Sequence, residues 1–104
     1  MQVQTNTDRN VDATQALSAQ VVAVVTDALS RFANQVTRVE VHFSDQNAEK
    51  GGADDKRCMM EARLEGRPPT AVTHQAATVE AAMDGAAAKL ARAIENVLGR
   101  LRSS

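Results

Sequence analysis

A row of polar residues near the C-terminus, three of them basic, has the clearest chemical potential in this sequence. Its members are Lys89, Arg92, Asn96 and Arg100. Their spacing of three, four and four residues places them on one face of a helix. From residue 86 onward the local charge is +3, because four bases stand against one acid: Lys89, Arg92, Arg100 and Arg102 against Glu95.

Such a row can bind phosphate groups. A helix rises about 16 Å between Lys89 and Arg100, which is enough to follow two or three phosphates of a nucleic acid backbone. A local positive field of this kind steers an anionic partner even on a protein of nearly neutral charge. The alternative is an ordinary solvated helix face.

No catalytic or metal-binding constellation accompanies the row. His42 falls on the polar side of a predicted strand, and His74 falls on the inward side of another, where a partly buried histidine is expected. Neither histidine has a Cys, Asp or Glu at a metal-ligand spacing. Cys58 has the inward phase of its strand and is expected to be a buried hydrophobic residue rather than a reactive thiol. Gly51–Gly52 lacks the context of a phosphate loop. From these observations together we predict no enzyme, cofactor, metal site or small-molecule substrate.

Length and composition predict a single domain over residues 1–104. Two Phe and no Trp or Tyr leave the core to Val, Ala, Leu, Met and Ile, which suits helices packed closely on a sheet. The formal charge of −1 indicates that the protein as a whole is not a polyelectrolyte ligand for nucleic acid. The single cysteine excludes an internal disulfide and fits a reducing compartment. With no leader-like N-terminus and no membrane-length apolar stretch, we predict a soluble cytoplasmic protein.

Two stretches have helical periodicity. Residues 78–101 carry apolar residues every three or four positions opposite the basic row, and Thr78 is the expected N-terminal cap. Those apolar residues are Val79, Met83, Ala86, Leu90, Ile94 (or Ala93), Val97 and Leu101. We also predict a helix over residues 14–33, although its β-branched residues 21–25 favour a strand by propensity. Asp12 is the expected cap of this first helix, and Gln15 would complete a capping box. Its apolar residues are Leu17, Val21, Val24, Ala28 and Phe32, with Val25 alongside.

Strands are predicted over residues 2–7, 37–44, 56–65 and 70–76. Val39, Val41 and Phe43 alternate with polar residues, as in a half-buried strand. Prolines at the start of the last strand favour an edge position. Residues 45–55 are polar and include two glycines, so we predict a mobile loop. The order β-α-β-β-β-α predicts an α+β two-layer sandwich, in which both helices cover one face of a four-stranded mixed sheet and strands one and two run parallel.

Two segments resemble a known family. Residues 81–92, AAMDGAAAKLAR, look like the final-helix signature of the ribosome hibernation promoting factor / ribosome-associated inhibitor (sigma-54 modulation protein) family. Residues 10–17, NVDATQAL, resemble the start of that family's first helix. The element order also matches, so the resemblance covers essentially the whole chain. Since the chain ends at Ser104, it would correspond to the short form, without the C-terminal dimerisation domain of the long form.

The resemblance implies a fold similar to that of double-stranded-RNA-binding domains. It also implies binding to the small ribosomal subunit, in the channel where messenger and transfer RNA normally lie. Family members thereby silence ribosomes in stationary phase or stress, and some promote ribosome dimers. The family places helix bases against ribosomal RNA phosphates, which assigns this role to Lys89 and Arg92 within the matching string. Arg100 and Arg102 extend the assignment by position.

The chain departs from the family on its first helix, whose exposed face usually carries several Lys or Arg. Here that face offers Ser18, Val22, Thr26 and Ser30. Our first hypothesis is a non-enzymatic protein that binds the small ribosomal subunit and inhibits translation. The alternative is the same fold used as a protein-interaction or regulatory module, through an edge strand or a mixed-charge sheet face. That face would contain Arg38, Glu40, Arg57, Glu61 and Arg63.

Overall fold

The computed structural model describes residues 1–8, 11, 14–45 and 56–103, with side chains up to residue 100. Its elements are β1 (Gln2–Thr7), α1 (Gln15–Ala28), a 3-10 turn (Ser30–Phe32), β2 (Val36–Asp45), β3 (Lys56–Leu64), β4 (Thr70–Ala76) and α2 (Val79–Ser103). The strands form one sheet in the order β1-β2-β3-β4. β1 is parallel to β2, and the other pairs are antiparallel. This confirms the predicted mixed sheet and element order.

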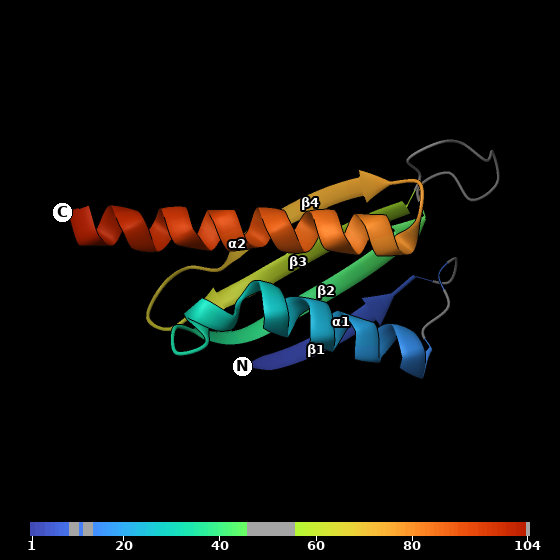
Figure 1. Cartoon of the computed structure of the whole chain (residues 1–104), viewed down its shortest axis with the longest axis horizontal. Helices are drawn as coiled ribbons and strands as arrows, with labels where there is room; N and C mark the ends of the chain where they lie inside the picture. Colours follow the sequence, from blue (N-terminus) through green and yellow to red (C-terminus); the bar gives the residue numbers. More distant parts are fainter. Residues whose placement is uncertain (9–10, 12–13, 46–55, 104) are drawn as a thin grey trace.

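Both helices cover the same face of the sheet (Figure 1). α2 packs on β3 and β4, whereas α1 packs on β1 and against α2. The strand residues predicted to point inward are buried beneath them, namely Val39, Val41, Phe43, Cys58, Met60, Ala62 and Leu64. The helices contribute Val21, Val25, Leu90 and Ile94, each fully buried, and α2 adds the small buried residues Ala82, Ala86 and Ala87. These alanines let α2 approach the sheet closely.

The N-terminal cap of α1 differs from the prediction. The Thr14 Oγ1 accepts a hydrogen bond from the Leu17 backbone N–H at 3.0 Å, so the threonine satisfies a backbone donor that the first helical turn leaves free. The predicted cap, Asp12, lies outside the described residues. Threonine and aspartate both suit the cap position. In this chain Thr14 is the cap, because its side chain reaches the backbone N–H of Leu17, the third residue of the helix.

α1 also ends earlier than predicted, at Ala28 rather than at residue 33. The backbone N–H of Leu29 still donates to Val25 at 2.9 Å, and the chain then tightens into the 3-10 turn. A 3-10 turn has three residues per turn, so Phe32 returns to the side of Leu29 and both are buried. The apolar spacing therefore continues past the end of the α-helix.

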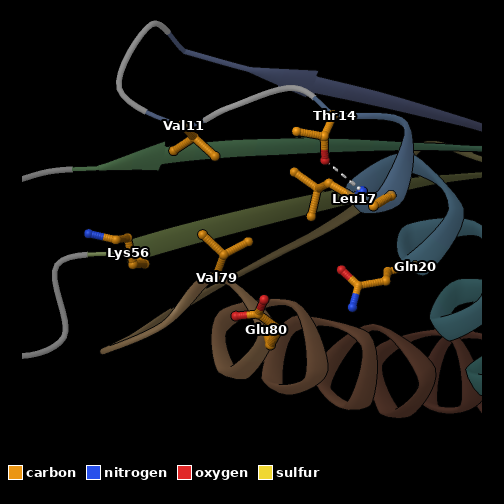
Figure 2. Close-up of a pocket in the computed structure, with 8 residues that line it drawn as sticks. Val11, Thr14, Leu17, Gln20, Lys56, Val79 and Glu80 are labelled. Carbon is orange, nitrogen blue, oxygen red and sulfur yellow. Dashed lines mark hydrogen bonds between the residues drawn. The ribbon is translucent and has the colours of Figure 1, made fainter.

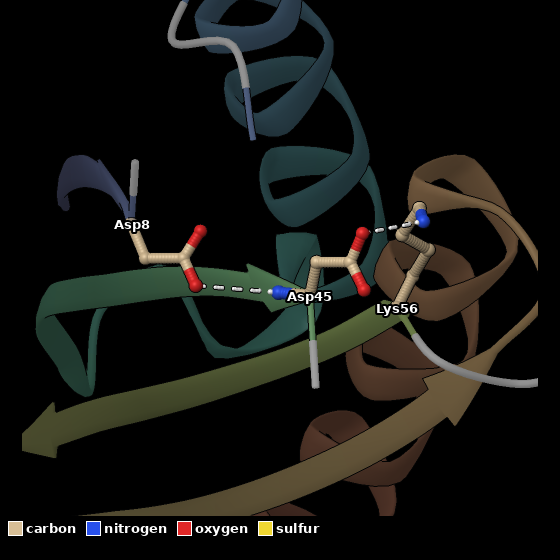
Figure 3. A network of polar contacts seen from close by, with 3 residues as sticks. All are labelled: Asp8, Asp45 and Lys56. Carbon is tan, nitrogen blue, oxygen red and sulfur yellow. Dashed lines mark hydrogen bonds and ion pairs between the residues drawn. The ribbon is translucent and has the colours of Figure 1, made fainter. Parts of the chain in front are cut away.

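Polar contacts join the ends of three strands (Figure 3). The backbone N–H of Asp45 donates to an Asp8 carboxylate oxygen at 3.3 Å. The carboxylate of Asp45 in turn accepts from the Lys56 ammonium at 2.9 Å. Asp45 is thus the last residue of β2 rather than the first residue of the predicted loop. Residues 46–55, the remainder of that prediction, lie outside the described residues.

β4 is an edge strand, as predicted. The turn before it uses Gly66 at a φ of +71°, in the left-handed region that glycine enters without a Cβ clash. Pro68 and Pro69 follow, and within the described part of the chain β4 then pairs with β3 alone. One long side of β4 therefore faces outward beside α2 (Figure 1).

Candidate nucleic-acid interface

The two faces of α2 are oriented as the sequence predicts. The helix starts after Thr78, whose Oγ1 accepts from the backbone N–H of Ala81 at 3.0 Å. Its apolar positions Met83, Leu90 and Ile94 are buried on the sheet. The basic row, on the other side, is exposed to solvent: Lys89, Arg92, Asn96 and Arg100. Arg102 lies in the last turn, beyond the residues whose side chains are described.

The contact made by Lys89 shows which neighbouring element the basic row approaches. The Lys89 ammonium donates to the backbone carbonyl of Thr73 in β4 at 3.0 Å. The positive charge therefore sits at the open edge of the sheet. Lysine side chains at such an edge also discourage unwanted strand pairing. The basic row of α2 therefore lies next to the outer edge of β4.

The acid nearest the row in sequence is directed elsewhere. Glu95 lies three residues from Arg92, but its carboxylate pairs with the guanidinium of Arg31 at 2.8 Å. Arg31 also lies over the Phe32 ring, 4.7 Å from its centre. Both charged side chains are more than half exposed, at 58% and 56%, so the pair adds under about 1 kcal/mol to stability. Its larger effect is to remove an acid from the row: among the described side chains, no ion pair neutralises Lys89 or Arg92.

α1 contributes no base to this surface. Between Gln15 and Ala28 the only charged residue is Asp27, and the exposed side includes Ser18 and Val22. The nearest base, Arg31, is occupied by Glu95. The structure therefore places the predicted site residues on α2 alone.

The uncovered face of the sheet carries charges in rows that cross the strands. Arg38 of β2 lies opposite Arg63 of β3, and Glu40 lies opposite Glu61. Like charges directly opposite one another destabilise a sheet slightly. Arg38 offsets this by pairing with Glu40 along its own strand at 2.7 Å, and it also donates to the Gln4 side chain. Arg57 and Arg63 of β3 are exposed on this face, and among the described side chains no ion pair includes either of them.

Figure 2 shows a cleft of about 400 Å³ where the N-terminal ends of α1 and α2 face each other. Val11, Leu17 and Val79 form its apolar part. The polar residues Thr14, Gln20, Lys56 and Glu80 complete it, together with Ala16. Thr14 is already used as the helix cap and Lys56 binds Asp45. No sequence motif marks this cleft, because its residues come from three separate stretches, within 11–20, at 56 and at 79–80.

The two histidines and the cysteine occupy the predicted environments. His42 is half-buried on the open face, and His74 is half-buried where its ring meets Gly85 of α2. Within the described part of the chain, no three His, Cys, Asp or Glu residues gather as a metal site. Gly51–Gly52 lies outside that part. Among the described residues, no helix combines the length and apolarity needed to cross a membrane.

Cys58 is fully buried, and burial raises the pKa of its thiol from 9.0 to about 12. At pH 8 about one thiol in 10⁴ is then ionised, against about one in ten at the ordinary value. Because the thiolate is the nucleophile, the native protein should resist iodoacetamide, and the protein in 6 M guanidinium should react at once. Mass spectrometry after a timed quench measures both. Equal rates in the two states would contradict the buried placement.

The comparisons with known proteins agree with this fold. The model of the family described as sigma 54 modulation protein / S30EA ribosomal protein matches residues 5–102. No curated protein matches the chain. The N-terminal domain of Protein Y from Thermus thermophilus has a TM-score of 0.75 at 19% identity, over 93% of this chain and 99% of that one. A ribosomal subunit interface protein from Coxiella burnetii has a TM-score of 0.63 at 15% identity, over the whole of both chains.

At 19% and 15% identity the two solved structures support only the shared fold. The match to the family model supports membership of the family. This match covers nearly the whole chain, including α1, the entire sheet and α2. It thereby confirms the resemblance seen in residues 10–17 and 81–92. This chain belongs to the sigma 54 modulation protein / S30EA ribosomal protein family.

Proposed function

We propose that the protein binds the small ribosomal subunit through ribosomal RNA and inhibits translation under stress, without chemistry of its own. Membership of a ribosomal protein family supports a ribosomal partner. The two similar structures are described as Protein Y and as a ribosomal subunit interface protein. A ribosomal partner would place the protein in the cytoplasm.

The basic row on α2 is the observation that carries this proposal. Lys89, Arg92 and Arg100 are exposed along about 16 Å of helix, and Glu95 is held away from them by Arg31. In the proposal, Lys89 and Arg92 contact RNA phosphates, with Arg100 and Arg102 in support. Contacts of this kind release counterions, so the affinity should fall steeply as salt rises.

Sedimentation with purified small ribosomal subunits tests the proposal. At about 50 mM salt the protein should migrate with the subunit, and it should leave the subunit as salt approaches 0.5 M. Adding the protein to a translation extract should lower the synthesis of a reporter. Absence of co-sedimentation at low salt would contradict the proposal. Capture of a partner that survives nuclease treatment would favour a protein-interaction module instead.

A further inference from the structure

The two flanks of α2 have opposite charge. Lys89 reaches β4, so the basic row lies on the flank that faces the sheet edge. On the other flank, Glu80 lines the cleft shared with α1, and Glu95 pairs with Arg31 just beyond α1. Asp84 follows Glu80 by four residues and lies on the same line of the helix. The helix therefore presents bases toward β4 and acids toward α1.

The surface between the two helices carries more acids than bases. Its acids are Glu80, Asp84 and Glu95 from α2 and Asp27 from α1, and its bases among the described residues are Arg31 and Lys56. Arg31 is already paired with Glu95. Glu80 and Asp84 are about 6 Å apart along the axis of α2, within the Debye length of about 10 Å at 0.1 M salt, so these two acids act together on an approaching phosphate. An RNA that spans both helices would have to pass over them.

On the other side of β4, bases outnumber acids by one. Among the described strands β3 alone adjoins β4, and its residues Arg57 and Arg63 are exposed on the uncovered sheet face. Neighbouring strands lie about 4.8 Å apart, so both guanidinium groups are within reach of the edge. Arg67 is exposed in the turn that leads into β4. Glu61 and Glu65 are the acids on this side.

β4 itself has no acidic side chain and offers backbone donors. Its sequence, TAVTHQA, contains no Asp, Glu, Lys or Arg. Thr73 lies opposite Met59 in the ladder, and its carbonyl points outward to Lys89. In an antiparallel ladder both backbone groups of such a residue face the same way, and every second residue repeats the pattern. The N–H groups of Ala71, Thr73 and Gln75 therefore face the open edge, and backbone N–H groups are common phosphate ligands.

We propose that ribosomal RNA contacts the protein on both sides of the β4 edge, rather than lying across the two helices. One phosphate backbone contacts Lys89, Arg92 and Arg100 on α2, and a second contacts Arg57 and Arg63 on the uncovered sheet face. β4 enters the groove between the two backbones. The partner is thus a folded RNA with phosphates on both sides of a groove. This inference rests on the proposed function and adds residues of β3 and β4 to its site.

Two lysine pairs with equal charge change test the position of the RNA. Ala71→Lys/Gln75→Lys adds two charges at the β4 edge, and Ser18→Lys/Val22→Lys adds two charges on α1. All four positions are exposed. Each new phosphate contact steepens the plot of log K against log salt by about 0.7–0.9. We expect the β4 pair to tighten binding to purified small subunits about tenfold or more and to steepen the slope, whereas the α1 pair changes affinity less than about twofold.

Removal of Arg57 and Arg63 tests the second backbone. Arg57→Gln/Arg63→Gln should flatten the salt slope by about 1.4–1.8 and weaken binding about 25- to 60-fold at 0.1 M salt. The fold should tolerate the change, because it removes the repulsion between Arg63 and Arg38. Thermal unfolding of each variant checks this.

The possible outcomes separate the two proposals. If the α1 pair tightens binding as much as the β4 pair, the RNA spans both helices and the inference is wrong. An unchanged affinity for Arg57→Gln/Arg63→Gln would also overturn it. In either case the proposed function still stands if Lys89→Glu/Arg92→Glu abolishes binding. If the unmodified protein does not bind at low salt, both proposals fail.

Discussion

Reversing the charge of Lys89 and Arg92 together should remove most of the affinity for the small ribosomal subunit. Loss of two phosphate contacts weakens binding about 25- to 60-fold at 0.1 M salt, and the two new carboxylates add repulsion. Both side chains are exposed, and Lys89 makes only its contact with Thr73 across the edge. The variant should therefore unfold within a few degrees of the unmodified protein. Co-sedimentation at several salt concentrations measures the affinity and its slope.

A pair of variants matched in net charge separates local contact from overall charge. Lys89→Gln/Arg92→Gln and Ser18→Glu/Val22→Glu each change the protein charge by −2. Only the first pair alters the row on α2. We expect a weaker complex and a flatter salt slope for the first pair and little change for the second. Equal effects of the two pairs would show that net charge, or RNA contact with α1, contributes as much to binding as the row does.

Gly85→Ala should destabilise the fold, although alanine is the better helix former. A Cβ at this position would overlap the ring of His74 in β4. Overpacking of this kind costs about 1–3 kcal/mol, and the gain in helix propensity returns up to about 1 kcal/mol. Thermal and urea unfolding measure the difference. Because Lys89 lies one turn after Gly85, the same change should also displace its ammonium from the Thr73 carbonyl.

Gly99→Ala in the same helix is the matched control. A Cβ at Gly99 meets no atom within 4 Å, so this variant should gain about 0.5–1 kcal/mol of stability. The double variant Gly85→Ala/His74→Ala should recover much of the loss, since the smaller side chain leaves room for the new methyl group. If Gly85→Ala were as stabilising as Gly99→Ala, the close approach of α2 to β4 would be contradicted.

Much of this architecture follows from local patterns in the sequence. Val39, Val41 and Phe43 alternate with polar residues, and the burial of alternate residues in a strand makes that pattern readable. The end of α1 was not predictable in the same way. Leu29 and Phe32 keep apolar spacing through a 3-10 turn, so the periodicity carries no sign that the helix has ended. The cap was misassigned because Asp12 and Thr14 are both suitable residues.

The contacts that shape the candidate site join residues far apart in the chain. Arg31 and Glu95 are 64 positions apart, and Lys89 and Thr73 are 16 apart. Helical spacing shows that Lys89 and Arg92 share a face, but it does not show which neighbouring element that face approaches. The close approach of Gly85 to the His74 ring is likewise not visible in the sequence. These contacts arise from how α2 is laid across β3 and β4.

The parallel pairing of β1 with β2 has a consequence for the order of folding. It places Val3 beside Val39, so the loop formed by the chain between these two residues must close before β1 can pair with β2. The β3–β4 hairpin closes through a turn of five residues, 65–69, at a far smaller entropic cost. The hairpin and α2 should therefore form the folding nucleus, and β1 should dock last. Weakened contacts in β1 would then speed unfolding while leaving the folding rate almost unchanged.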